Sequence, residues 1–178
     1  MRKTLVLAVA AMSLALTGCP KKEKEKKPDV TKAGGNIEAK SGSKVSGNVE
    51  FEMAPDGRLK MTLNVQGLTP GDHGVHIHET GDCSAPDAAS AGGHFNPTEM
   101  AHGAPGGPAH HAGDLGNMNA NANGTGAMTM SISGLSLNEK KTSVVGKALI
   151  VHEKADDMTT QPTGGAAGRV GCVVIKAM

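Results

Sequence analysis

Aromatic residues are almost absent from this chain of 178 residues. It has no Trp and no Tyr, and its only two Phe are Phe51 and Phe95. Aromatic side chains usually supply a large part of the buried area of a core, so we expect a core built from Val, Ile, Leu, Met and Ala. We also expect bound metals or a disulfide to compensate for the missing rings.

A long apolar run and an excess of charge of one sign are also missing. The longest apolar stretch, residues 5–16, is shorter than the ~20 residues that a membrane-spanning helix needs. It follows Arg2 and Lys3, which is typical of a cleaved leader. Without those two residues, 16 of the 18 basic side chains remain against 17 acidic ones. This balance gives no support to nucleic-acid binding, which usually needs a strong basic excess.

The leader ends in Leu16-Thr17-Gly18-Cys19. This sequence resembles the bacterial lipoprotein signal, in which cleavage precedes a cysteine that then carries lipid. It predicts a signal peptide over residues 1–18 and lipidation of Cys19, which would anchor the protein to a membrane of the cell envelope, facing the periplasm or the surface. Pro20, where an aspartate would indicate inner-membrane retention, favours the outer membrane. An ordinary secretory signal is the alternative, and either one predicts export.

Residues 19–35 contain charges of both signs and no apolar periodicity. We expect the lipidated cysteine to be followed here by a flexible, solvated tether. A basic patch for anionic lipid is the rival interpretation, which Glu23 and Glu25 weaken.

Residues 36–178 suit one domain. No stretch of it has a convincing helical period, and several short stretches alternate between apolar and polar residues. Residues 54–57 form a turn cluster between two of them, which predicts a hairpin, and Gly146 predicts a bulge in a long strand. The predicted strands cover residues 43–53, 58–68, 73–79, 113–121, 125–135, 142–153 and 168–178. Many short strands with Gly-rich turns predict an all-β sandwich or barrel.

Histidine is concentrated in one stretch of the chain. Seven of the eight histidines lie in residues 73–114, and imidazole is the commonest metal ligand among side chains. His76 and His78 are two residues apart in a predicted strand, so both should point to one face while Val75 and Ile77 point into the core.

The following residues supply further ligands. His94, His102, His111 and Asp114 follow one another at intervals of 8, 9 and 3 residues. Three imidazoles and a carboxylate make a closed four-coordinate set of the kind that zinc prefers. An all-imidazole set with an open face suits copper, among other metals. The sequence therefore supplies enough ligands for two metals.

Five stretches carry a family resemblance: GVHIHETGDC, SAGGHFNP, HHAGDLGN, LIVHEKADD and GRVGCVVI. They resemble the bacterial branch of the copper,zinc superoxide dismutase family, and the match covers about residues 44–177. The resemblance implies an immunoglobulin-like Greek-key β-sandwich or barrel with long metal-binding and electrostatic loops. It implies copper on His76, His78, His94 and His152, and zinc on His94, His102, His111 and Asp114, with His94 bridging the two ions. His73 and His110 are left over.

Further roles follow from the resemblance. Asp156 would hydrogen-bond one ligand of each metal, and Arg169 would draw and orient the superoxide anion. Cys83 and Cys172 would form a disulfide; two free thiols, or a pairing with Cys19, are the alternatives. The implied activity is dismutation of superoxide to oxygen and hydrogen peroxide by a redox-cycling copper, with His94 supplying a proton, in protection of the cell envelope from extracytoplasmic superoxide.

Some positions depart from the family pattern. Val75 replaces a Phe and Gly165 replaces an Asn, while Gly171 and Val173 invert the small and large residues beside Cys172. None of these changes removes a ligand. A copper-storage lipoprotein and a noncatalytic domain with structural metals remain as other interpretations, although Arg169 argues against simple storage. A homodimer is possible, but no apolar stripe identifies its interface.

Overall fold

The computed structural model describes residues 29–178. The predicted signal peptide, the predicted lipidation site at Cys19 and most of the predicted tether lie outside these residues. Within residues 29–178, no helix has the length and apolar character needed to cross a bilayer.

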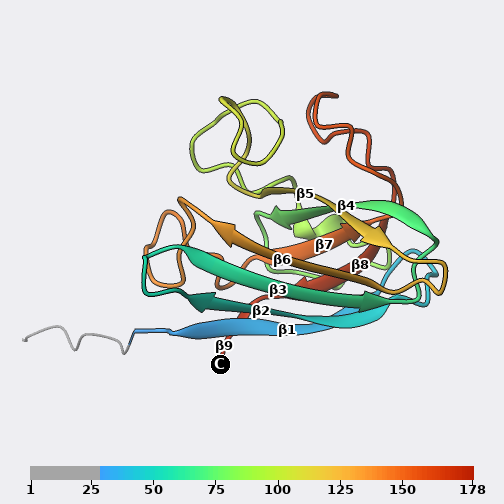
Figure 1. Cartoon of the computed structure of the whole chain (residues 1–178), viewed down its shortest axis with the longest axis horizontal. Helices are drawn as coiled ribbons and strands as arrows, with labels where there is room; N and C mark the ends of the chain where they lie inside the picture. The colour runs from blue at the N-terminus through green and yellow to red at the C-terminus, as the bar shows by residue number, and fades with distance from the viewer. Residues whose placement is uncertain (1–28) are drawn as a thin grey trace, which may run out of the picture.

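Eight antiparallel strands form a closed barrel (Figure 1). Around the barrel their order is β1-β2-β3-β6-β5-β4-β7-β8, and pairing of β1 with both β2 and β8 closes it. The connections β3–β4 and β6–β7 pass over intervening strands, which is the Greek-key pattern that the family resemblance implies. The strands are β1 (Lys32–Ala39), β2 (Ser46–Met53), β3 (Leu59–Gln66), β4 (Gly71–His78), β5 (Asp114–Ala120), β6 (Gly126–Ile132), β7 (Ala148–His152) and β8 (Arg169–Val174).

Two short elements complete the fold. A 3-10 helix, η1 (Ala89–Ala91), lies in the β4–β5 loop, and β9 (Lys176–Ala177) pairs with β1. The β4–β5 loop (residues 79–113) and the β7–β8 loop (residues 153–168) extend from the same side of the barrel, beside β4 and β5 (Figure 1). These two loops cover the outer face of β4 and β7.

The sequence does not predict β1. The tether is predicted to extend to residue 35, but it ends before β1 begins at Lys32. β1 begins at Lys32, which pairs with Glu52 of β2. Its apolar alternation is carried only by the small Ala33 and by Ile37, with two glycines between them. A Cβ at Gly34 would lie 2.1 Å from the carbonyl oxygen of Val49. The close approach of the two strands therefore explains the glycine that hides the strand in the sequence.

The strand predicted over residues 142–153 is shorter than expected. β7 begins at Ala148, and Gly146 has φ +81° in a turn before it, not in a bulge. Val144 is fully buried although it lies in the loop before β7. An apolar residue at this position extends the alternating pattern in the sequence beyond the true start of the strand. The register shifts that the structure does contain fall between Gly74 and His76 and between Val151 and His152.

The core contains the aliphatic side chains and methionines that the composition predicts. Phe51 is fully buried beside Leu, Ile, Val and Met side chains of the barrel. A second, smaller cluster lies around the predicted disulfide, which the structure confirms between Cys83 and Cys172. The bridge joins residues 89 positions apart, and the chain-entropy model assigns about 4–5 kcal/mol to a loop of that length.

Candidate metal centre

Three of the candidate ligand histidines come from two adjacent strands. His76 and His78 lie on β4, and His152 ends β7, whose residue Ile150 pairs with His76. Val75 and Ile77 point into the barrel, as the alternation predicts, and both are fully buried. His76 and His78 point to the outer face, where the long loops bury them completely. A rigid sheet therefore fixes these imidazoles.

The β4–β5 loop brings His94 to the same place. Its backbone forms an isolated antiparallel bridge with His78. Hydrogen bonds from Phe95 N to Ile77 O (2.8 Å) and from Glu79 N to Gly93 O (2.9 Å) hold it on both sides. The His76 and His94 rings are consequently only 3.9 Å apart between centroids.

The ligand atoms fall into two convergent sets that share one residue. The imidazole set is His76, His78, His94 and His152, and the carboxylate set is His94, His102, His111 and Asp114. In each set, one potential ligand atom per residue lies within 4.8 Å of all the others, and every member is buried. His94 belongs to both sets, so a single ring can face two ions.

The imidazole set has bare nitrogens where a metal would bind. Among the described residues, the buried atoms His76 Nδ1, His78 Nε2, His94 Nε2 and His152 Nε2 have no hydrogen-bond partner. Each such atom costs about 1–3 kcal/mol when it is left unpaired. Four unpaired nitrogens in one place fit a metal ion bound by nitrogen ligands. No protein group among residues 29–178 donates or accepts a hydrogen bond at these four atoms.

The ligand atoms of the carboxylate set are spaced as they would be around a tetrahedrally coordinated ion. The Nδ1 atoms of His94, His102 and His111 lie 2.8, 3.0 and 3.3 Å from Asp114 Oδ1, and His111 Nδ1 lies 3.3 Å from His94 Nδ1. A tetrahedral zinc with bonds of about 2.0–2.1 Å has ligands about 3.3 Å apart. Asp114 Oδ2 accepts hydrogen bonds from the backbone N–H groups of Gly103 and His111, which fixes the carboxylate.

Burial sets the charge of the ligands. It lowers the pKa of His78 to about 2 and that of His152 to about 3, so both rings are neutral at pH 7, as a metal ligand must be. Burial works to raise the pKa of Asp114, but hydrogen bonds from His94, Gly103 and His111 outweigh it and hold that pKa below its ordinary value. Asp114 is therefore an anion.

Asp156 connects the two sets. Its Oδ2 lies 2.7 Å from His76 Nε2, and its Oδ1 lies 3.0 Å from His102 Nε2. The Asn117 side chain holds both the N–H and the C=O of Asp156, at 2.7 and 2.8 Å. Gly164 packs against this junction at φ +69°, and a Cβ there would lie 1.8 Å from Asp156 Oδ1. Such outer partners fix the tautomer and orientation of ligand rings.

Gln161 is a supporting residue that the sequence does not identify. Its Oε1 accepts from the backbone N–H of His102, and its Nε2 donates to the C=O of the same residue, both at 2.9 Å. One side chain of the β7–β8 loop thus holds the backbone of a residue 59 positions away. Asn117, Gly164 and Gln161 have no motif of their own, so only the folded contacts reveal them.

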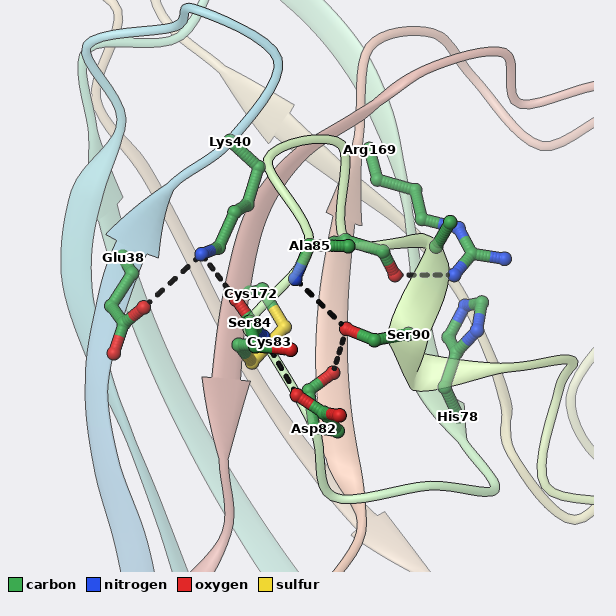
Figure 2. The surroundings of a disulfide bond; sticks show 12 residues. Glu38, Lys40, His78, Asp82, Cys83, Ser84, Ala85, Ser90, Arg169 and Cys172 are labelled. Carbon is green, nitrogen blue, oxygen red and sulfur yellow. Dashed lines mark hydrogen bonds and ion pairs between the residues drawn. A yellow bond between two sulfur atoms is a disulfide. The ribbon is translucent and has the colours of Figure 1, made fainter.

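Arg169 lies beside the imidazole set. Its Nη1 and Nη2 each donate a hydrogen bond of 2.7 Å, to Ala88 O and Gly92 O respectively. Gly92 O also accepts from His78 Nδ1 at 2.9 Å, so one carbonyl orients both side chains. Figure 2 shows the guanidinium next to His78, with Arg169 leaving the strand that carries Cys172. An arginine held in this way can receive a small anion.

The two left-over histidines lie outside both sets. The ring nitrogens of His73 are each 2.8 Å from a carbonyl oxygen, of His152 and of Thr69, so His73 supports the backbone of His152. His110 Nδ1 donates to Gly107 O at 3.1 Å.

The departures from the family pattern fit their surroundings. Gly171 is small because a Cβ there would lie 2.9 Å from Ile37 Cγ2. Val75 and Val173 are buried in the barrel core. Gly165 has φ +63°, and a Cβ there would lie 3.4 Å from Asp157 Oδ2. Nothing in the described residues requires an Asn at this position.

Together, the fold and the site define a two-metal protein on an eight-stranded Greek-key barrel, with one histidine shared between the metal sites. Residues 45–175 match the family model described as "Copper/zinc superoxide dismutase (SODC)". The chain belongs to this family, as the sequence resemblance predicts. It is therefore an enzyme that uses copper and zinc to dismutate superoxide.

A solved structure supports the same fold. The protein of the "Crystal Structure Analysis of the clock protein EA4" is 33% identical, with a TM-score of 0.79. The match covers 88% of this chain and 100% of that one.

Proposed function

We propose that the imidazole set holds copper, that the carboxylate set holds zinc, and that the enzyme protects the cell envelope from superoxide. The bare nitrogens of the imidazole set carry the first assignment, since copper favours imidazole ligands. Three imidazoles and a carboxylate at tetrahedral spacing favour zinc. When bound, copper supplies the one-electron chemistry that turns two superoxide ions and two protons into oxygen and hydrogen peroxide.

His94 is the residue that we propose to move a proton. Its Nδ1 lies in the carboxylate set, 2.8 Å from Asp114 Oδ1, while its Nε2 faces the imidazole set without a partner among the described residues. The ring therefore stays fixed through Nδ1 while Nε2 accepts a proton and delivers it to the reduced oxygen species. A proton donor held in position before the reaction is the basis of general acid catalysis.

Arg169 is the residue that we propose to attract and orient superoxide. Two carbonyl acceptors hold its guanidinium beside His78, and it is only partly buried. It therefore presents a permanent positive charge next to the imidazole set. Electrostatic attraction of this kind raises the association rates of small anions.

We also propose that the protein is an exported lipoprotein. The leader over residues 1–18 and the sequence before Cys19 favour it, and the Cys83–Cys172 disulfide is typical of an oxidising compartment. The protein would face the periplasm or the surface, anchored preferentially to the outer membrane.

Superoxide decay and metal content, measured on the same purified sample of the mature chain, test the enzyme assignment. We expect fast decay with about one copper and one zinc per chain, from the two sets of four ligands. Both metals without decay would instead support a copper carrier or a domain with structural metals. Labelling with a fatty acid, compared between the wild type and Cys19→Ala, tests the anchor. Equal labelling would contradict it.

A further inference from the structure

Lys40 is an unusual lysine, because it lies directly after β1 with its side chain only 10% exposed. Its Nζ donates a hydrogen bond to the carbonyl oxygen of Cys83 and lies 3.2 Å from the Glu38 carboxylate. Figure 2 shows this side chain reaching from the end of β1 to the backbone next to the disulfide. Lysines are seldom buried unless they are paired, so a local need for its charge and length is indicated.

The turn that begins with Lys40 also holds the backbone of Arg169. Ser41 Oγ donates to Arg169 O at 2.9 Å, and Ser43 Oγ donates to Val170 O at 2.7 Å. The backbone N–H of Lys40 donates to Val170 O at 2.9 Å. Residues 40–43 therefore fix the first residues of β8, where the Arg169 side chain originates.

The same turn holds the segment that receives the guanidinium. We call residues 82–92 the disulfide segment; it contains Cys83 and the two carbonyls that accept from Arg169, those of Ala88 and Gly92. Besides the bond from Lys40 to Cys83 O, Ser41 N donates to Pro86 O at 2.8 Å. The anchors of residues 40–43 thus reach both the backbone of Arg169 and the acceptors of its side chain.

The disulfide segment has little apolar packing of its own. The cluster around it contains two cysteines, three alanines and Ile150, with the partly buried Val174 packed against it. The bond Cys83–Cys172 fixes it at one end, and Ser90 ties Ala85 N to Asp82 O within it (Figure 2). Small side chains contribute little burial energy. Polar contacts to the barrel must therefore do much to hold the disulfide segment in place.

We infer that Lys40 is a positioning residue for Arg169. It acts by holding the carbonyl of Cys83 and, with it, the disulfide segment whose carbonyls orient the guanidinium. The charge-assisted bond from Nζ is stronger than a neutral one, and Glu38 keeps the ammonium in place. This inference rests on the proposed role of Arg169 as the anion-binding group.

The variant Lys40→Met tests this inference, because it keeps much of the side-chain length and removes the donor and the charge. In the zinc-loaded protein we expect dithiothreitol to reduce Cys83–Cys172 roughly tenfold faster, as the loss of one bond from a charged donor implies. In the copper- and zinc-loaded protein we expect azide, followed by the copper absorption, to bind several-fold more weakly. Superoxide dismutation should fall by a similar factor, with both metals retained.

Matched variants separate positioning from other effects. Lys60→Met removes an exposed lysine of β3 and should leave disulfide reduction and azide affinity unchanged. Ser41→Ala removes a single bond to Arg169 O without changing charge, and should weaken azide binding to a smaller degree. If Lys40→Met does not fold, Glu38→Gln tests the same contact, because it removes the carboxylate that lies 3.2 Å from Lys40 Nζ, and it should speed disulfide reduction to a smaller degree.

Several outcomes would overturn the inference. Disulfide reduction at the wild-type rate in Lys40→Met would show that Lys40 does not anchor the segment. Faster reduction with unchanged azide affinity would show that the anchor does not reach Arg169. A loss of dismutation that disappears at high ionic strength would assign Lys40 a long-range charge effect instead. A wild-type protein without dismutation would contradict the proposed function, while disulfide reduction would still test the anchor.

Discussion

The two ligand sets share His94 but rest on different supports. The imidazole set takes three of its four members from β4 and β7. The carboxylate set takes three members from the β4–β5 loop and one, Asp114, from the first residue of β5. Strands of a closed barrel hold their side chains whether or not an ion is present, whereas a loop needs additional contacts. Asp156 and Gln161 of the β7–β8 loop supply those contacts for His102.

Removal of both metals should give the largest effect and sharpen this contrast. A metal ion present at about a thousand times its dissociation constant stabilises the folded state by about 4 kcal/mol, so we expect the melting temperature to fall by roughly 10 °C or more and activity to vanish. Hydrogen exchange should increase in residues 79–113 and 153–168 and stay slow in β4 and β7. Equal loss of protection in the strands would contradict the proposed difference in support.

His152→Ala removes a strand-borne ligand from the imidazole set alone. If about 10–16 kcal/mol of metal binding is shared among four ligands, the loss of one weakens copper binding by roughly 70-fold to 1000-fold. Metal analysis after dialysis should find zinc retained and copper lost. Loss of zinc before copper would mean that the two sets are assigned to the wrong metals.

Arg169→Ala tests a residue that depends on both kinds of support, since its backbone is in β8 and its guanidinium is held by the β4–β5 loop. We expect dismutation to fall by roughly tenfold to a hundredfold, because a guiding charge of this kind raises on-rates by such factors. Both metals should remain bound. Unchanged activity at low ionic strength would remove its assigned role.

Asp156→Asn should partly erase the contrast, because this one carboxylate contacts both sets. Loss of an outer partner typically costs about 10–100-fold in metal affinity. We expect weaker binding of both metals in competition with a chelator, with the larger loss for zinc, since His102 lies on a loop. A loss of affinity for copper alone would contradict this expectation, because it would show that His76 on β4 depends on Asp156 more than His102 on the loop does.

Gln161→Glu should give the smallest effect, and one confined to the carboxylate set. A carboxylate still accepts from His102 N but cannot donate to His102 O, so we expect zinc to dissociate several-fold faster. Gln66→Glu is the matched control, because Gln66 is exposed and its side chain donates to the Ser46 hydroxyl, away from both ligand sets. Stopped-flow measurement with a chromogenic chelator compares the two variants, and equal rates would argue against the Gln161 contact.

The sequence predicts the centre far better than it predicts the supports. His76 and His78 can be assigned to one face because the alternation of a strand is strict, and the family resemblance implies the pairing of Cys83 with Cys172. Gln161 and Lys40 cannot be predicted in the same way. Gln161 contacts the backbone of a residue 59 positions away, and Lys40 contacts the backbone of a residue 43 positions away. Because every residue type has the same backbone carbonyl, such a contact does not require a particular residue at the partner position.

The strands show the same limit. β2 and β3 carry regular apolar alternation, and the sequence predicts them nearly to their ends. β1 escapes prediction because close contact with β2 requires glycine, which removes the alternating side chains from the sequence. Val144 produces the opposite error, since a buried loop residue extends the apparent strand before β7.

The pairing of β1 with β8 also fixes when the domain can be completed. A chain that emerges from a ribosome or a translocation channel with its N-terminus first delivers β1 at the start and β8 near the end. The last seam of the barrel and the Cys83–Cys172 bond both wait for that final strand. Contacts so distant in sequence form slowly. Until β8 arrives, β1 can pair only with β2, and the first strands must avoid aggregation with one edge of β1 unpaired.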